Sequence, residues 1–553
     1  MINVGLPPSV TARLRRLAAG FTCGIALLGG AAAQAPAIPD LGPVAAVPAA
    51  DTMPSGWAQR GVFMEILVRS YQDSNGDGIG DLAGLTQRLD YLQQLGIKGI
   101  WLMPVFKSED HDHGYAVVNY RDIESDYGSL ADFDKFLAEA HRRGIAVILD
   151  YVMNHVSSAH PVFESAYDSR KSPYADWFIF AEDKPRGWNT FAGDPWREGN
   201  QRWYYAVFDP GMPDFNLRNP KVVDFHLDNL RFWLNRGVDG FRFDAVGVLF
   251  ENSAIAWENQ PENHQLLKRV QELLASYGNK YLVCESPSDP APFATSDSCG
   301  SAFAFGLHKH IMGSVKIGRL RDDLLYNLRK LPVPRLATLL ANHDYFAGPR
   351  LMKQFAGDEK SYKVAAATLL TLPGTPFVYY GEEIGLGMSE GAGNADQTIR
   401  GPMSWSAEAH AGFTTAAKPY RPSVSNWKTH NVAVQQAAPD SLLNWYRGLI
   451  TLRNAEPALS VGSMTPLSER DAPIFAFMRE HEGSRLLVLI NFAYRESTFT
   501  LPAGFQADGW TVAFPSGAAL PFAAAKKGGA AKPGTEAAQV KLAAQQVLIL
   551  KAR

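Results

Sequence analysis

Apolar segments of strand length alternate with amphipathic segments of helical length through most of this chain. The first apolar segment, 62–68, precedes a helical segment, 82–95, whose leucines recur at helical spacing until Gly96 ends it. A second strand at 97–106 and a second helix follow, and a third strand covers 145–152. Strict alternation of strands and helices predicts an α/β fold, a parallel sheet with helices outside it.

The alternation is interrupted once, by an aromatic-rich segment with few helical signals. We interpret 156–220 as a domain B inserted after the third strand. Further strands follow, and strand six, the least marked of them, is expected near 302–305. Eight strands predict a (β/α)8 TIM barrel formed by 59–155 and 221–460, with catalytic groups at the carboxyl ends of its strands.

Both ends of the chain differ in texture from the barrel. Residues 1–33 combine arginines with an apolar run and a small-residue stretch, which predicts a signal peptide, or an anchor if uncleaved, and a periplasmic or extracellular protein. Alanine and proline in 34–58 predict a linker, and short apolar runs in 461–553 predict a C-terminal antiparallel β-sandwich domain. A formal charge of −3 over 553 residues gives no general attraction to nucleic acid.

Two cysteines remain after the predicted signal peptide, Cys284 and Cys299. They either form one disulfide in an oxidising compartment or stay as two free buried thiols, since Cys284 lies in a predicted buried strand. The sequence does not decide between these alternatives.

Three acidic residues each follow an apolar strand. Arg242 and Asp244 project to one face because they are two apart on a strand, and the guanidinium predicts a low pKa for Asp244. Glu285 and Asp344 end two other apolar segments, and Glu285 has no cation near it in the sequence, which predicts a raised pKa. One ionised and one protonated carboxyl group suffice to cleave a glycosidic bond.

A loop after the first strand carries oxygen ligands at alternate positions around glycines, at Asp73, Asn75, Asp77 and Asp81. This spacing suits Ca²⁺, and a metal-free turn is the alternative. The loop is not an EF-hand, because Gly84 stands where that motif has its final glutamate.

Five motifs have counterparts in a known family: Asp150-Tyr-Val-Met-Asn-His155, Met212-Pro-Asp-Phe-Asn216, Gly240-Phe-Arg-Phe-Asp244, Glu285 and Asn342-His-Asp344. They resemble the signature regions of the α-amylase family, glycoside hydrolase family 13. The Met212–Asn216 motif is similar to that of a group intermediate between oligo-1,6-glucosidases and neopullulanases.

The resemblance implies a retaining enzyme with Asp244 as nucleophile, Glu285 as acid/base and Asp344 as a stabiliser of the distorted sugar. It implies further substrate contacts for Tyr115, His155, Arg242 and His343. The loop 73–81 resembles the metal loop of oligosaccharide-cleaving members, which implies a structural Ca²⁺ and a ligand role for the carbonyl of Ile79.

Departures from the family pattern bear on specificity. Gly247 and Val248 stand where many starch-degrading members have Lys-His, so the usual interdomain calcium is not expected. Asp112 and Arg400 stand where related α-glucosidases grip the non-reducing end of the substrate, although Asp112 is alternatively a solvated loop acid.

The main expectation is a secreted hydrolase of α-1,4 bonds in maltooligosaccharides or starch, with an α-glucan as its partner. The segment 258–270 is similar to trehalose synthases, which keeps an α-glucosidase or a transglycosylase and isomerase open as alternatives. A non-catalytic amylase-fold binding protein is a remote third alternative, because such relatives lack the catalytic acids.

Overall fold

The computed structural model describes residues 40–47, 53–501, 509–518 and 539–553. The predicted signal peptide lies outside these residues, as does part of the predicted linker. No helix in the described ranges is both long and apolar enough to cross a membrane.

Eight parallel strands close into a barrel in the order β1-β13-β12-β11-β10-β9-β5-β2. They are β1 (Phe63–Ile66), β2 (Gly99–Leu102), β5 (Ala146–Tyr151), β9 (Gly240–Phe243), β10 (Tyr281–Cys284), β11 (Ala302–Phe303), β12 (Leu336–Thr338) and β13 (Thr375–Tyr379). All their residues are buried, as expected of parallel strands covered on both faces. The predicted TIM barrel is confirmed, including strand six.

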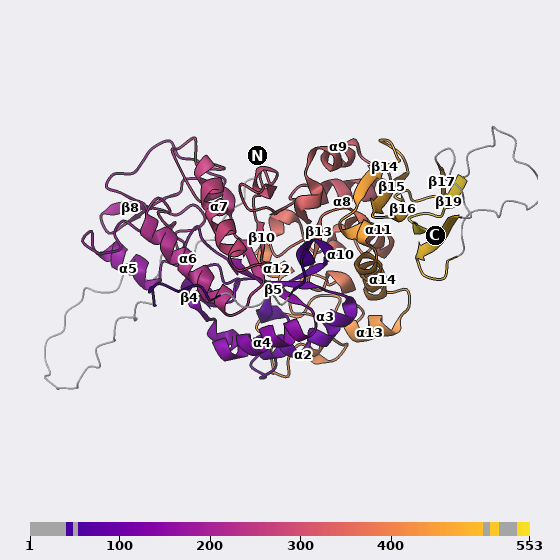
Figure 1. Ribbon diagram of the computed structural model, residues 1–553. Coiled ribbons are helices and arrows are strands. Elements are labelled where there is room, and N and C mark those ends of the chain that lie inside the picture. Colours follow the sequence, from indigo (N-terminus) through magenta and orange to yellow (C-terminus); the bar gives the residue numbers. More distant parts are fainter. Residues whose placement is uncertain (1–39, 48–52, 502–508, 519–538) are drawn as a thin grey trace, which may run out of the picture. The chain divides into compact units, whose positions relative to one another are not determined.

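Helices surround these strands (Figure 1). The main ones are α3 (Leu89–Leu95), α4 (Leu130–Arg142), α6 (Pro220–Asn235), α7 (Pro261–Ala275), α8 (Leu307–Ile317), α11 (Glu359–Thr371) and α14 (Leu442–Ala455). The helix predicted over 82–95 is two helices, α2 (Leu82–Gln87) and α3. Arg88 lies between them with non-helical backbone angles, and its Nε donates to Gln72 Oε1 at 2.7 Å.

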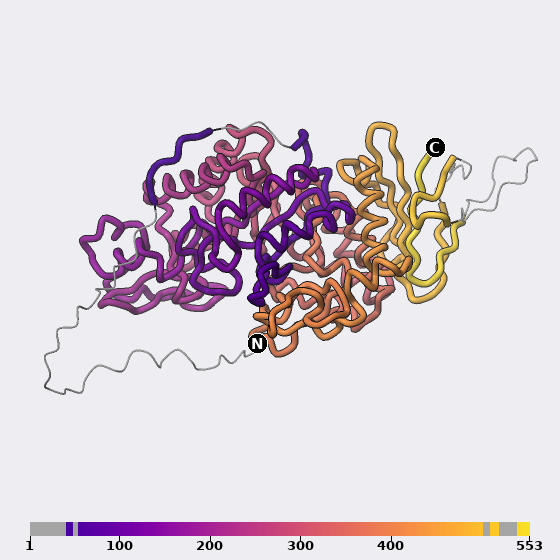
Figure 2. The backbone as a smooth tube through the Cα atoms, turned by 90° about the horizontal axis from the view of Figure 1, so that it is seen from below, coloured from indigo at the N-terminus to yellow at the C-terminus, as the bar shows by residue number. Residues whose placement is uncertain are grey.

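Smaller sheets lie outside the barrel. The inserted segment contributes the antiparallel sheet β6-β8-β7, made of Phe180–Ala181, Arg202–Tyr205 and Trp196–Gly199. The C-terminal part forms the sheet β14-β15-β16-β20-β18, in which β14 is Ser463–Pro466 and β18 is Trp510–Phe514. Its strands β15 (Ile474–His481), β16 (Ser484–Asn491) and β20 (Val547–Ala552) lie together in orange to yellow in Figure 2. This confirms an antiparallel C-terminal domain, while the domain boundaries stay predictions.

Cys284 and Cys299 are joined by a disulfide, with their Cα atoms 6.1 Å apart. Of the two alternatives that the sequence leaves open, the structure has the bonded pair. The bond ties the end of β10, directly before Glu285, to the segment that leads into β11.

Two buried arginines join the C-terminal turn of α11 to its neighbours. Arg453 of α14 donates to the carbonyls of Leu370, Leu372 and Gly374 at 2.5–2.9 Å. Arg479 of β15 donates to the carbonyl of Thr371 at 2.5 Å. Cations at a helix C-terminus interact favourably with its dipole and satisfy carbonyls that have no partner within the helix.

Candidate functional site

Arg242 is the centre of the carboxylate cluster at the carboxyl ends of the barrel strands. Its Nη1 lies 2.7 Å from Asp244 Oδ1 and 2.8 Å from Asp150 Oδ1, and its Nη2 lies 2.6 Å from Glu285 Oε2. The three acids come from the neighbouring strands β5, β9 and β10, so the sheet order brings them to one guanidinium. Glu285 has no cation near it in the sequence, but Arg242 reaches it from the adjacent strand.

Burial dominates the electrostatics of this cluster. It raises the pKa of Glu285 to about 7 and that of Asp244 to about 6, although Arg242 opposes both shifts. The prediction of a low pKa for Asp244 is wrong, since desolvation outweighs its ion pair. Asp244 nevertheless stays the more acidic of the two, which matches an ionised nucleophile beside a protonated acid.

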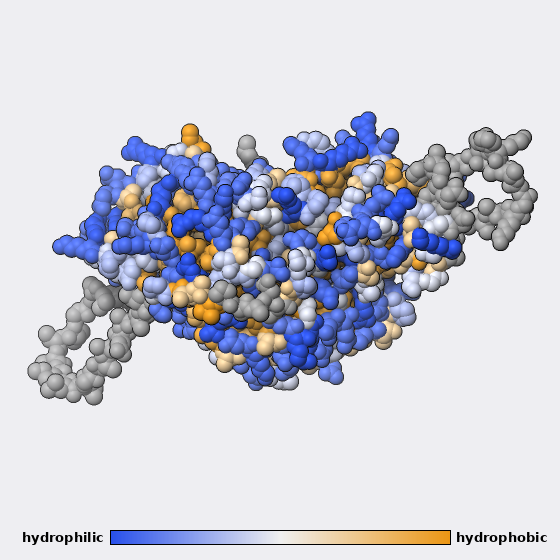
Figure 3. Space-filling view, viewed as in Figure 1, coloured by the Kyte–Doolittle hydropathy of each residue, from blue (hydrophilic) through white to orange (hydrophobic). Residues whose placement is uncertain are grey.

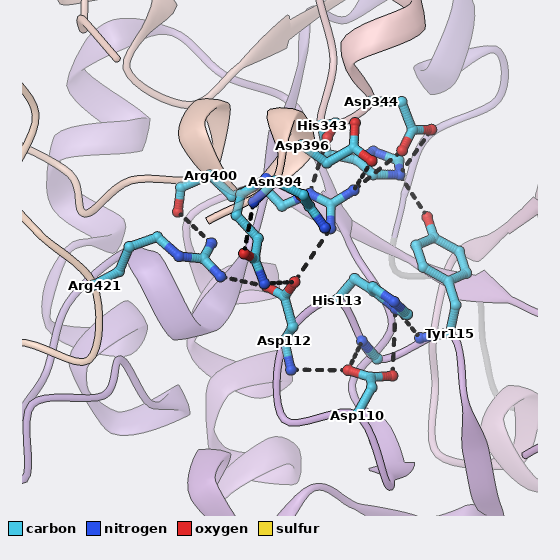
Figure 4. A network of polar contacts seen from close by, with 12 residues as sticks. Asp110, Asp112, His113, Tyr115, His343, Asp344, Asn394, Asp396, Arg400 and Arg421 are labelled. Atoms are coloured by element: carbon cyan, nitrogen blue, oxygen red, sulfur yellow. Dashed lines mark hydrogen bonds and ion pairs between the residues drawn. The ribbon is translucent and has the colours of Figure 1, made fainter. Parts of the chain in front are cut away.

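Asp344 is held on the other side by a chain of polar groups (Figure 4). His343 Nε2 lies 3.2 Å from Asp344 Oδ2 and 2.9 Å from the hydroxyl of Tyr115, while His343 Nδ1 lies 2.5 Å from Glu65 Oε1. The rings of Tyr115 and His343 stack, with centroids 5.6 Å apart. Burial raises the pKa of Asp344 to about 7, and the charge of Glu285 adds to that shift. His343, with Tyr115 stacked on it, thus connects Asp344 to Glu65 of β1.

Next to Asp344 lies a polar group that we call the end wall, formed by Asp112, Arg400, Arg421 and Gln397, of which Figure 4 labels the first three. Arg421 Nη2 lies 2.7 Å from Asp112 Oδ1, and Gln397 donates to Asp112 Oδ2 at 3.1 Å. Arg400 lies 3.7 Å from Asp112 and 3.2 Å from Asp344. The Asp112 side chain is 14% exposed, so it is no solvated loop acid.

His155 and Ala245 both contact the inserted segment, His155 through a β-bridge to Asp214 and Ala245 through a buried cluster that contains Tyr205. The buried ring of His155 lies 5.2 Å from that of Phe208. Ala245, directly after Asp244, has a left-handed backbone with φ 47°, and its N–H donates to Glu285 Oε2 at 3.2 Å. A left-handed non-glycine residue is uncommon and concentrates at functional sites.

Sequence reasoning missed several residues of the site. Glu65 was not predicted, and Asp150 was named only as the first residue of a motif, without a role. Both are acids inside fully buried strands, a signal that the sequence carried, since lone acids seldom interrupt such strands. Arg421 follows β13 in an irregular segment and meets Asp112 across 309 positions of sequence, so no local pattern pointed to it.

The predicted metal loop lies between β1 and α2. Asp73 and Asp81 are buried, and Gly76 and Gly78 have positive φ, as the tight turn requires. Asp73 accepts hydrogen bonds from the backbone of Asn75, Gly76 and Gly78, and Asp81 caps α2 by accepting from Gly84 N–H at 2.6 Å. The loop offers carboxylate, amide and carbonyl oxygens, the donor types that suit Ca²⁺.

A different trio, His111, Glu124 and Asp126, offers potential ligand atoms within 4.8 Å of one another. Arg69 Nη1 lies 2.8 Å from Asp126 Oδ2, so the guanidinium group already balances the charge of this carboxylate. The trio therefore adds no metal site.

Comparisons with known proteins agree with this geometry. The model of the alpha amylase catalytic domain matches residues 65–462. The trehalose synthase/amylase TreS of Mycobacterium tuberculosis is 32% identical over 548 residues, covering 87% of this chain and 88% of that protein. Alpha-amylase 3 of Dictyoglomus thermophilum is 34% identical over 457 residues, covering 80% and 87%.

Solved structures with the same fold include the trehalulose synthase MutB of Pseudomonas mesoacidophila, at 28% identity and a TM-score of 0.77. They also include the alpha-glucosyl transfer enzyme XgtA, at 29% identity and a TM-score of 0.76. Each covers 90% of this chain and is itself covered completely. On the barrel, the carboxylate cluster and the extent of these matches, the chain is an enzyme that belongs to the α-amylase family, glycoside hydrolase family 13.

Proposed function

We propose that this protein removes one glucosyl unit at a time from the non-reducing end of short α-glucosides such as maltose, with retention of configuration. The observation that carries the proposal is the end wall. Asp112 is fixed by Arg421 and Arg400, and Arg400 also contacts Asp344, the carboxylate expected to bind the reacting sugar. We take the end wall to close the cleft beyond that sugar. A cleft closed at that end favours short substrates over internal attack on starch.

The reaction follows from the positions of the two acids. An oxygen of Asp244 attacks the anomeric carbon, the bond to the leaving oxygen breaks, and the carboxyl proton of Glu285 passes to that oxygen. In the second half, Glu285 takes a proton from the acceptor hydroxyl, whose oxygen attacks the anomeric carbon and releases Asp244. Arg242 keeps both carboxyl groups oriented throughout.

The acceptor is water in a hydrolase and a sugar hydroxyl in a transferase or isomerase. Relatives named trehalose synthase, trehalulose synthase and alpha-glucosyl transfer enzyme support a sugar acceptor. The relative named alpha-amylase 3 supports water. We favour transfer, including conversion of maltose to another disaccharide, over the hydrolysis of α-1,4 bonds in maltooligosaccharides or starch that the sequence led us to expect.

A time course of products from maltose and from maltoheptaose, with the anomer followed by proton NMR, tests this proposal. We expect glucose in the α form and a new disaccharide from maltose, and shortening by single units from maltoheptaose. Early mixtures of maltotriose and longer fragments from maltoheptaose would contradict the closed end.

We further propose a periplasmic or extracellular location and a structural Ca²⁺ at 73–81. The disulfide between Cys284 and Cys299 supports an oxidising compartment, and the oxygen-rich loop supports the cation. Determination of the mature N-terminus of the natural protein tests the first point. Metal analysis and melting with and without a chelator test the second, and a melting temperature unchanged by chelation would argue against the ion.

A further inference from the structure

The chain that follows Glu285 is less regular than the chain that follows Asp344. Asp344 leads directly into the 3-10 helix η6 (Tyr345–Ala347), whereas residues 286–291, all described by the structure, lie in no helix or strand. The position of Glu285 therefore depends on contacts at the end of β10, directly before it.

The two edges of β10 are paired unequally at that end. β10 pairs with β9 over four residues, but with β11 through the single pair Cys284 and Ala302, where the N–H of Cys284 donates to the carbonyl of Ser301 at 3.1 Å. On the β9 side, the N–H of Glu285 also donates to the carbonyl of Phe243 at 2.9 Å. The end of the strand is thus held firmly along one edge and weakly along the other.

The disulfide adds a covalent link on the weakly paired side. It joins Cys284, the last residue of β10, to Cys299, which lies shortly before β11. The N–H of Cys299 donates to the carbonyl of Phe293 at 3.1 Å, and the ring of Phe293 lies 4.4 Å from that of His264 on α7, between centroids. The bond therefore links the residue before Glu285 to α7 and to the approach to β11.

Both cysteines are fully buried. On the face in Figure 3 hydrophobic residues appear only in small, scattered patches, as expected where most apolar side chains are packed inside. A buried disulfide is poorly accessible to reductants in the medium. The bond is therefore a lasting part of the site, and substitution rather than reduction is the way to open it.

We propose that the disulfide between Cys284 and Cys299 positions Glu285 for proton transfer to the leaving oxygen. An acid that donates this proton must lie within hydrogen-bond reach of the oxygen, and small displacements lower its efficiency steeply. This inference rests on the proposed function, in which Glu285 is the acid. The cysteines act through Glu285, so they are positioning residues, and the attack by Asp244, which follows β9, should not depend on the bond.

Two substrates with unequal need for an acid test the bond. Maltose has a poor leaving group and needs the proton of Glu285, whereas the fluoride of α-D-glucosyl fluoride leaves with little help. For Cys299→Ala we expect kcat/KM on maltose to fall about tenfold, part of the hundredfold or more that an acid contributes, and on the fluoride to change less than about twofold. Cys284→Ala and the double variant should give the same pattern, because the bond is lost only once.

The pH profile on maltose gives a second measurement. The charged groups that face Glu285 are Arg242 and Asp244 from β9 and its end, Asp150 from β5 and Asp344 after β12, and none of them is changed in these variants. Burial raises the pKa of Glu285 to about 7, and a loosened segment admits water, which lowers that pKa. The fall in kcat/KM at high pH should therefore begin at a lower pH than in the wild type.

Arg453→Ala is the matched control for stability, because it removes hydrogen bonds at the other end of the barrel. If alanine leaves too little folded protein, Cys284→Val combined with Cys299→Ala keeps apolar volume without the bond. Equal losses on both substrates would overturn the inference, since the bond would then only support the fold, and so would unchanged activity on both. Mass spectrometry of peptides prepared without reductant must find the two cysteines joined, and free thiols at both would also overturn it. A wild-type protein inactive on both substrates would overturn the proposed function itself.

Discussion

Two of the regions that contain buried arginines differ in the partners of those arginines. At the carboxyl ends of the strands, Arg242 pairs with carboxylates that titrate. At the opposite end, Arg453 and Arg479 pair with backbone carbonyls at the C-terminus of α11, just before β13 begins. The same guanidinium group therefore organises reactive charge in one region and holds the chain together in the other.

The two regions differ in how the charges around their arginines affect the stability of the fold. Buried carboxylates around Arg242 raise one another's pKa, so that cluster stores repulsion which the fold must tolerate. The carbonyls near α11 do not titrate, and burial lowers the pKa of the two arginines that donate to them. We expect variants in the first region to lose activity and variants in the second to lose stability.

Asp244→Asn should give the largest effect. We expect kcat/KM to fall more than about a hundredfold, because the covalent nucleophile is lost. The melting temperature should hold or rise, because burial and Asp150 disfavour the charge that is removed. Kinetics on α-D-glucosyl fluoride together with thermal melting check both parts, with the exposed pair member Asp297→Asn as control. Activity above about 1% would remove Asp244 as nucleophile.

Arg453→Ala should reduce the stability of the protein and leave its activity nearly unchanged. Deleting the guanidinium leaves the carbonyls of Leu370, Leu372 and Gly374 without these donors, and we expect a loss of about 3 kcal/mol in the free energy of unfolding. Chemical denaturation measures that loss, and kcat of the folded fraction should change little. Arg329→Ala, an exposed arginine of α9 (Asp322–Lys330), is the control. Loss of activity without loss of stability would break the comparison.

Local patterns predicted the first region only in part. Strand ends placed Asp244, Glu285 and Asp344 at one edge, because barrel strands are parallel and their carboxyl ends meet. Which acid Arg242 would reach depended on β9 lying between β5 and β10, a fact of closure that no single segment encodes. Asp244 was misjudged for the same reason, since its burial comes from the whole barrel.

The second region could not be predicted from local patterns at all. Arg453 lies on α14 and Arg479 lies in the C-terminal sheet, and each meets carbonyls many residues away in sequence. A backbone carbonyl has no residue type, so composition and motif give no sign of it. Arg421 escaped prediction in a related way, since its partner Asp112 lies in a distant loop.

The pH dependence sharpens the comparison. The pair is competent when Asp244 is ionised and Glu285 protonated, so kcat/KM on maltose should fall below pH about 6 and above pH about 7. One unit beyond either limit we expect about a tenfold loss. α-D-Glucosyl fluoride needs less help from an acid, so the fall in kcat/KM at high pH should be smaller on this substrate. A pH profile that is flat from pH 4 to 9 on both substrates would contradict the assignment of Asp244 and Glu285.

Arg421→Met should give the smallest effect on activity. It tests whether Arg421 acts by orienting the Asp112 carboxylate or by its charge. Asp112 keeps Gln397 and Arg400 when Arg421 is removed, so the end wall should loosen without opening. We expect kcat/KM on maltose to fall about fivefold, because one charged hydrogen bond to Asp112 is lost while Gln397 and Arg400 still hold it. The activity on maltoheptaose should fall less. Competition between the two substrates in one reaction measures this preference directly. Arg421→Lys keeps the charge without the planar fork and should recover part of the loss. If the activities on maltose and on maltoheptaose fall together, Arg421 supports the fold of its loop as Arg453 supports α11, and Asp112 is held in the end wall by Gln397 and Arg400.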